Sequence, residues 1–183
     1  MRVYIPATLG MLRQLVSEGE LFPVSGTAFA VTPTLREAYA EGDDDELAEV
    51  ALGEAARASV RLLAAESSAD DGADGAATAA EPTDAERSLP LRRAVLVADI
   101  EPVTVRPDLD DAVVRVGAPC RIDAVVAAYV DNAAAEPAVR AAMAVIDEAD
   151  LGDEDAELTV GDALDHDLAW YATQELPFLL DLL

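Results

Sequence analysis

The sequence predicts an α+β fold, with a single two-layer domain over residues 1–183 and a mixed β-sheet of about four to six strands. The main observation is the segment 92–100, in which Ala94 to Ala98 is continuously apolar, rich in β-branched residues and too short for an ordinary helix. Such a run is typical of a strand covered on both faces in the middle of a sheet. Short apolar segments and helical patterns alternate along the rest of the chain, so helices can cover that sheet.

The N-terminal segment predicts a strand, a helix and a second strand. Residues 2–5 are the first strand, and Thr8 can cap a helix over 9–18 that ends at Gly19. Residues 28–32 are then a short strand. If the two strands are parallel, this β-α-β unit has a right-handed crossover.

Two helices are predicted next. Thr32 and Pro33 start a short helix that ends at Gly42, since proline at the first turn costs no hydrogen bond. The longer helix that follows has acidic residues from Asp43 to Glu46, where the helix dipole is positive. Its inner face is a stripe of apolar residues at helical spacing: Leu47, Ala51, Ala55, Ala58, Leu62 and Ala65.

Residues 66–88 differ in composition from the rest of the chain. They are rich in Ser, Ala, Gly and Asp and contain no large apolar side chain. Such a segment cannot bury enough surface to offset the entropy of ordering it. We therefore expect a flexible, disordered acidic insertion within the domain, either a surface loop of variable length or a functional acidic tail.

The segments after the central strand predict further strands and another helix. Residues 103–105 and 113–116 suit short edge strands around a turn at 107–111. Residues 121–131 fit either a helix face or a buried strand, because they are dense in Val and Ala. We favour a strand, since the clear helix at 135–149 would then belong to a second β-α-β unit. Two such units suggest a ferredoxin-like arrangement.

The C-terminal part is expected to hold an acidic loop, a strand and a short helix. The loop covers 147–157 and the strand covers 168–173. Trp170 and Tyr171 should face opposite sides of that strand, one in the core and one at the surface. Three large side chains of the last helix, 174–182, are expected to point toward the core: Phe178, Leu179 and Leu182.

The net charge of −25 is concentrated in three runs. Residues 41–49, 66–88 and 147–157 carry 20 of the 37 acidic residues, and only Arg87 offsets them. The remainder holds 17 acidic residues and 11 arginines, a net charge of −6. This balance would repel phosphates, so we expect no direct binding of nucleic acid.

Compartment and cysteine usage predict a cytoplasmic protein. No apolar run reaches membrane-spanning length, and the start of the chain lacks the apolar region of a signal peptide. Cys120 is the only cysteine, so no internal disulfide can form.

His166 is the only histidine and the main candidate for chemistry. It could act as a general base beside a carboxylate, or ligate a metal. On a strand, however, Asp165 and Asp167 would face away from it, and no residues stand at metal-ligand spacing. A solvated loop histidine is the alternative.

No other motif marks a site. The acidic run that begins at Asp150 fails the EF-hand pattern, and no glycine-rich phosphate loop is present. Ser59 and Cys120 lie in no motif that marks a nucleophile. We therefore assign no catalytic, cofactor-binding or metal-ligating residue, and no cofactor.

Three segments carry recognisable motifs: 2–8, 29–33 and 166–177. They resemble an uncharacterised actinobacterial family of small acidic proteins, and the resemblance spans nearly the whole chain apart from 66–88. The arginine-only, alanine-rich composition fits such a source. The resemblance implies no activity or ligand and contributes no functional residue.

Three functions stay open. The main hypothesis is a non-enzymatic interaction or regulatory module that binds a protein, either itself or another, through an exposed apolar patch. A small hydrolase-like enzyme would use His166 and nearby carboxylates that converge in a cleft. An acidic decoy for a basic protein would hold its carboxylates on rigid elements.

Overall fold

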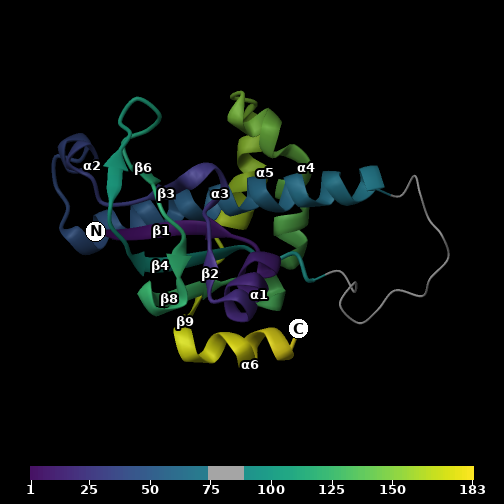
Figure 1. Ribbon diagram of the computed structural model, residues 1–183. Coiled ribbons are helices and arrows are strands. Elements are labelled where there is room, and N and C mark those ends of the chain that lie inside the picture. The colour runs from purple at the N-terminus through teal and green to yellow at the C-terminus, as the bar shows by residue number, and fades with distance from the viewer. Residues whose placement is uncertain (74–88) are drawn as a thin grey trace.

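A seven-stranded sheet forms the centre of the computed structural model, which describes residues 1–73 and 89–183 (Figure 1). The strand order is β5-β6-β3-β1-β4-β8-β9, and all neighbours in the described part of the chain pair antiparallel. A separate ladder joins β2 to β7. The strands are β1 (Arg2–Ala7), β2 (Glu20–Leu21), β3 (Thr27–Phe29), β4 (Ala94–Asp99), β5 (Val103–Val105), β6 (Val113–Val116), β7 (Cys120–Arg121), β8 (Val125–Val130) and β9 (Ala169–Ala172).

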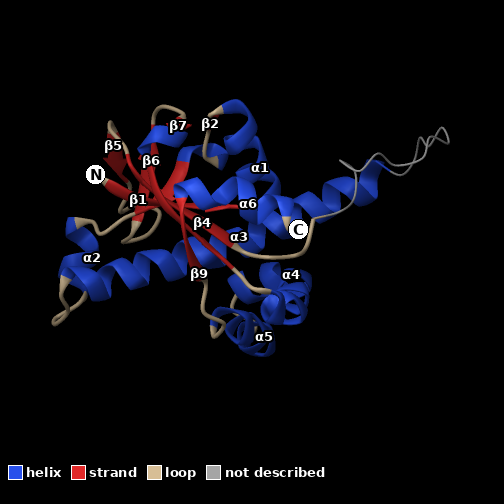
Figure 2. Cartoon of the chain, turned by 90° about the horizontal axis from the view of Figure 1, so that it is seen from below, coloured by secondary structure: helices blue, strands red, loops and turns tan. Residues whose placement is uncertain are grey.

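Helices cover both faces of this sheet (Figure 2). α1 and α6 pack on one face, α2 and α3 pack on the other, and α4 and α5 share a third apolar cluster with α3. The α+β class is confirmed, although helices on both faces add a layer to the two that were predicted. The helices are α1 (Leu9–Glu18), α2 (Pro33–Ala38), α3 (Asp44–Ala73), α4 (Glu136–Asp150), α5 (Glu154–Leu164) and α6 (Leu176–Asp181).

The predicted central segment is β4, which lies between β1 and β8. Leu96 is fully buried on the face of α1 and α6, while its neighbours Val95 and Val97 are buried on the face of α3. Side chains of a strand alternate between the two faces, so a strand covered on both requires a continuous apolar run. The prediction for this segment is confirmed.

The predicted β-α-β units are wrong, and the ferredoxin-like arrangement that rested on them is not observed. β1 and β3 pair antiparallel, with Tyr4 opposite Phe29, because β2 and a tight turn follow α1 and reverse the chain. β8 and β9 are also antiparallel, with Ala128 opposite Tyr171. Two helices rather than one join this second pair, so the chain returns in the opposite direction.

α3 extends into the segment that was predicted as a disordered insertion. The helix continues to Ala73, and Glu66 is anchored because the Thr8 hydroxyl donates to its carboxylate at 2.7 Å. The prediction is therefore wrong for 66–73, where the helix simply continues through polar residues. The rest of the predicted insertion, 74–88, lies outside the described residues.

The buried face of α3 also differs from the predicted stripe. Its first half agrees, but Ala65 is exposed at the C-terminal end, and Ser59, Val60 and Leu63 are buried instead. In this half the helix leaves the sheet and packs against α4 and α5, so a different face becomes the inner one. The sequence pattern does not reveal that change of partner.

The acidic segment 147–157 is folded, which corrects the prediction of a loop. α4 runs to Asp150, and α5 begins directly after Asp153. The Asp153 carboxylate caps α5 by accepting from the backbone N–H of Ala156 at 2.8 Å. Acidic residues in the first turn of a helix are stabilised by its dipole, so this run favours a helix start.

Most of the remaining elements lie where they were predicted. β6, however, lies between β5 and β3 rather than at an edge, and α2 ends at Ala38 rather than at Gly42. β5, β6, β8 and α4 lie where the sequence placed them, which confirms the choice of a strand within 121–131. In α6, Leu179 is buried as predicted, but Phe178 is 71% exposed, and Leu182, which follows the helix, is 85% exposed. The inner face is instead formed by residues at positions i, i+3 and i+4 of this helix: Leu176, Leu179 and Leu180.

Candidate functional site

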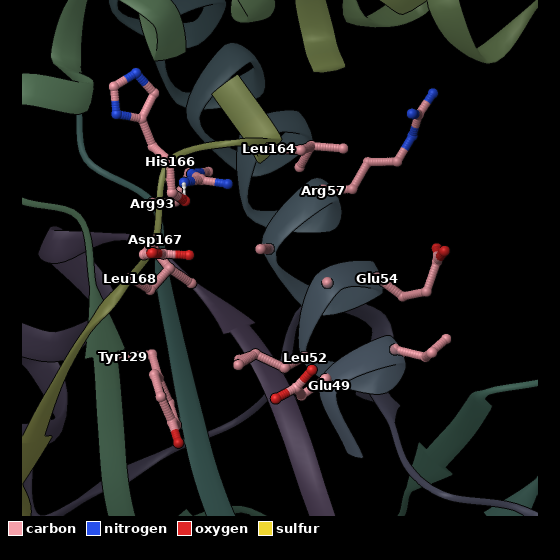
Figure 3. Close-up of a pocket in the computed structure, with 13 residues that line it drawn as sticks. Glu49, Leu52, Glu54, Arg57, Arg93, Tyr129, Leu164, His166, Asp167 and Leu168 are labelled. Carbon is pink, nitrogen blue, oxygen red and sulfur yellow. Dashed lines mark hydrogen bonds between the residues drawn. The ribbon is translucent and has the colours of Figure 1, made fainter. Parts of the chain in front are cut away.

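A cleft of about 610 Å³ opens beside α3 (Figure 3). α3 forms one wall, and the segment 166–168, which links α5 to β9, forms the other. Tyr129 of β8 also lines the cleft. This size is in the range of pockets that hold small ligands, so the cleft is our candidate functional site.

A buried ion pair fixes the wall formed by 166–168. The side chains of Arg93 and Asp131 are 1% and 0% exposed, and two guanidinium nitrogens donate to the carboxylate at 2.8 and 2.7 Å. Arg93 Nη2 also donates to the backbone carbonyl of His166 at 2.8 Å. Breaking such a pair leaves an unpaired charge in the interior. The contact therefore holds the segment before β9 in one position.

Two carboxylates face the cleft from opposite walls. Figure 3 shows Glu49 and Leu52 projecting from α3 on the side of Tyr129, and Asp167 on the opposite wall. Within residues 1–73 and 89–183, neither carboxylate has a cationic side chain in ion-pair contact. This part of the cleft is therefore negatively charged.

The arginines that line the cleft are already engaged. Arg93 pairs with Asp131, as described above, and Arg57 donates to Asp150 at 3.0 Å and to Glu157 at 2.8 Å. Their positive charges are balanced by these partners. An anion in the cleft would therefore find both of these arginines already paired with carboxylates.

Glu54 projects from the opposite side of α3, away from Tyr129 (Figure 3). Burial raises the pKa of the Glu54 carboxyl above its ordinary value, and the negative charge of Asp110 raises it further. Arg57 and Arg61 act in the other direction. The ionised form of Glu54 is therefore less stable in this environment than in water.

His166 lies in the cleft wall, but its ring does not meet the carboxylates. Figure 3 shows the imidazole directed away from Tyr129 and Glu49. In the described part of the chain, no hydrogen bond to the imidazole was found, and only the backbone carbonyl of His166 is engaged. The convergence that the enzyme hypothesis requires is therefore missing between these groups.

An aromatic pair lies next to the cleft. Trp170 of β9 is directly opposite Tyr129 of β8, so the two side chains are neighbours on the α3 face of the sheet. Trp170 is 57% exposed, whereas Tyr171 packs partly against the core on the other face. This arrangement agrees with the prediction that one of the two residues is at the surface.

The other residues considered from the sequence are structural. The fully buried Ser59 donates to the carbonyl of Ala7 at 2.7 Å and accepts from the N–H of Ala94 at 3.1 Å, so it joins β1 to β4. Cys120 is buried at the start of β7, and burial raises the pKa of its thiol to about 11. Such a thiol is a poor nucleophile at neutral pH.

The acidic residues do not assemble a metal site in the described part of the chain. Among the side chains that the structure describes, those of 1–69 and 89–183, no three from His, Cys, Asp or Glu are close enough to hold a metal ion. The run from Asp150 to Glu157 instead caps α5 and pairs with Arg57 and Arg61.

The Arg93–Asp131 pair was missed by sequence reasoning. Ala94 is opposite Val130 in the β4–β8 ladder, and the two charged residues occupy the next position beyond it. Opposite charges that flank two apolar runs are a usable signal, but only when the strands are known to be neighbours. Three strands, β5, β6 and β7, lie between β4 and β8 along the chain, so the sequence does not show that these two strands are neighbours.

A protein-family model matches residues 1–180. The chain belongs to DUF6912, a family of unknown function. The match to DUF6912 covers all nine strands and both walls of the cleft. Comparisons with curated proteins and with solved structures gave no match. Among the residues of this DUF6912 chain that the structure describes, no helix has the length and apolarity to cross a membrane.

Proposed function

We propose that this chain is a protein-interaction module that adds an extended, basic segment of a partner protein to the free edge of β9. The observation that carries this proposal is the composition of that edge. β9 is the last strand of the sheet, all four of its residues are apolar, and Trp170 is 57% exposed. Edge strands are usually protected by charges, proline or bulges, because unpaired backbone groups attract another strand.

The backbone of β9 has outward-facing groups at Trp170. The N–H of Ala172 donates to the Glu175 carboxylate at 2.7 Å, so it points away from β8. Backbone groups of residues two apart point to the same side of a strand. The N–H and C=O of Trp170 therefore lie on the outer edge, where an added strand would pair with them.

The charge around β9 favours a basic partner. Asp167 precedes the strand and Glu175 follows it. A second copy of the chain would bring the same carboxylates together, whereas a basic segment would be attracted by them. We place this interaction in the cytoplasm, as the composition predicts.

The experiment uses a short dye-labelled peptide of alternating valine and arginine, with binding followed by fluorescence anisotropy. We expect saturable binding to the full chain. The same peptide with N-methyl groups on alternate amides keeps its charge but cannot pair as a strand, so its binding should be lost. Trp170→Lys should abolish binding, whereas Thr104→Lys on the other sheet edge should leave it unchanged.

Three results would contradict the proposal. Equal binding of the N-methylated peptide would show that charge alone attracts the peptide. Equal loss of binding in Thr104→Lys would show that the effect is not specific to β9. Sedimentation velocity that reveals a dimer abolished by Trp170→Lys would assign the edge to a second copy of the chain instead.

A further inference from the structure

We infer that the cleft between α3 and the segment 166–168 binds an organic cation, namely a guanidinium or alkylammonium group. Such a group is carried by an arginine or lysine side chain and by free polyamines. This inference goes beyond the docking of a strand on β9, because it rests on the cleft and holds whether or not the edge is occupied.

The first argument is the placement of charge. Glu49 and Asp167 are exposed and face the cleft from opposite walls (Figure 3). Carboxylates are the side-chain groups that bind guanidinium and ammonium cations through charge-assisted hydrogen bonds. Since the described residues provide no cationic partner for either, a bound cation would supply the missing charge.

The second argument is the apolar surface between these carboxylates. The Tyr129 ring lines the cleft, and the face of an aromatic ring attracts a cation. Leu52 and Leu168 also line it and can cover the methylene stem of an arginine, a lysine or a polyamine. A small hydrated ion would gain no favourable contact from these aliphatic side chains.

The third argument excludes competing ligand classes. Arg57 and Arg93 already have carboxylate partners, so an anion finds no open positive charge among the lining residues. In the chain segments that the structure describes, no three acidic, histidine or cysteine side chains approach closely enough to hold a metal ion. An organic cation with distributed charge does not need such a set of three ligands.

The fourth argument is preorganisation. The buried Arg93–Asp131 pair holds the carbonyl of His166, which directly precedes Asp167. The Asp167 wall is therefore fixed before any ligand arrives, and the ordering cost of binding is reduced.

The test is isothermal titration calorimetry on the full chain with small probes. N-acetylarginine methylamide carries the guanidinium without charged ends, and N-acetylcitrulline methylamide is its neutral counterpart. We expect binding of the arginine probe that is at least about tenfold tighter than that of the citrulline probe. Spermidine is titrated in parallel. Tighter binding of spermidine would assign the site to free polyamines, and tighter binding of the arginine probe would assign it to a protein side chain.

Matched variants locate the site. Glu49→Gln and Asp167→Asn should each weaken the arginine probe by about tenfold, because each removes a charged contact. Glu148→Gln removes the same charge from an exposed position on α4 outside the cleft and should change the affinity by less than about twofold. Tyr129→Leu should weaken binding, and Tyr129→Phe should restore it because the ring is kept. Thermal unfolding of each variant confirms that it is folded.

The inference is overturned if the citrulline probe binds as tightly as the arginine probe, or if Glu148→Gln weakens binding as much as Glu49→Gln does. It is also overturned if neither cation binds. The two proposals fail separately. Loss of small-cation binding with intact Trp170-dependent peptide binding rejects the cleft alone, and the reverse result rejects the β9 edge alone.

Discussion

The two edges of the sheet are built in opposite ways. β5 has only three residues, with Pro102 before it and Pro107 two positions after it, and the Arg106–Asp108 pair lies at the surface. β9 has four apolar residues without proline or charge, and the segment before it is held by an ion pair inside the protein. One edge is protected against other strands, whereas the other is left open and anchored from within.

This difference shows what the Arg93–Asp131 pair does for the fold. A surface pair such as Arg106–Asp108 is solvated in any conformation and fixes little. A buried pair has only one arrangement in which both charges are satisfied, so it specifies the position of the residues bonded to it. The segment before the open edge is therefore held by a buried contact, whereas the pair beside β5 lies at the surface.

The largest expected effect comes from breaking the buried pair. Asp131→Asn leaves the Arg93 guanidinium without its counter-charge and should lower the free energy of unfolding by about 3–5 kcal/mol. Asp108→Asn at the other edge should leave the urea midpoint unchanged. Equal midpoints for the two variants would mean that burial does not separate the two edges.

A second prediction concerns the centre of the sheet, where Ser59 of α3 bonds to both β1 and β4. Ser59→Ala removes the hydroxyl that joins β1 to β4 and leaves a buried C=O and N–H with one partner fewer. We expect a loss of about 1–3 kcal/mol in urea unfolding. Ser68→Ala, at an exposed position of the same helix, should cause no loss. A Ser59→Ala variant as stable as the wild type would refute the bridging role.

The Arg61–Asp150 pair is less buried than Arg93–Asp131 and tests whether burial determines how much an ion pair contributes to stability. Arg61, by its hydrogen bond, and then Arg57 lower the pKa of the Asp150 carboxyl, whose side chain is 31% exposed. Its stabilisation should be present above the ordinary value of 3.8 and be lost as the pH falls through the lowered pKa. Asp150→Asn should therefore destabilise less than Asp131→Asn and flatten the acid side of the stability curve.

Glu54 provides the control of opposite sign for that pH series. Its raised pKa means that its contribution is present below the ordinary value of 4.5 and is lost as the pH rises. Glu54→Gln should therefore be slightly more stable than the wild type at neutral pH. Denaturant unfolding across the acid and neutral range measures both variants, and curves that change in the same direction would contradict the assigned signs.

The smallest effect is expected from charges placed on the two edges. Trp170→Lys and Thr104→Lys alter exposed side chains, so each should change the stability by less than about 0.5 kcal/mol. This result would show that Trp170 is not needed for folding. A large fall in melting temperature for Trp170→Lys would instead make it a packing residue.

The sequence predicted elements whose signals are local. α1 was predicted from its Thr8 cap and from Gly19 at its end. β4 was predicted from a continuous apolar run, which is typical of a strand covered on both faces. Strand direction was not predictable, because a helix between two strands does not by itself fix whether they run parallel. α5 was missed because its acidic start looks like a loop until Asp153 is recognised as a cap.

The cleft could not be predicted from the sequence for a similar reason. Glu49 and Asp167 are more than a hundred positions apart and come together only through the sheet order. His166 attracted attention as the only histidine, yet its backbone carbonyl rather than its ring makes the structural contact. The unusual residue type therefore pointed to the right segment of the chain. The sheet topology determined that the backbone of His166, and not its ring, makes the contact.

The place of β1 in the sheet has a consequence for synthesis of the chain. β1 lies in the centre, but Arg2 pairs with Asp99 and the other β1 residues pair along β4. At about 5–20 residues per second, a ribosome needs roughly 5–20 s to deliver that partner. Until then, Val3 and Ile5 have an incomplete sheet beside them. We expect the sheet to close only after β4 has left the ribosome, so folding during translation is governed by the second half of the chain.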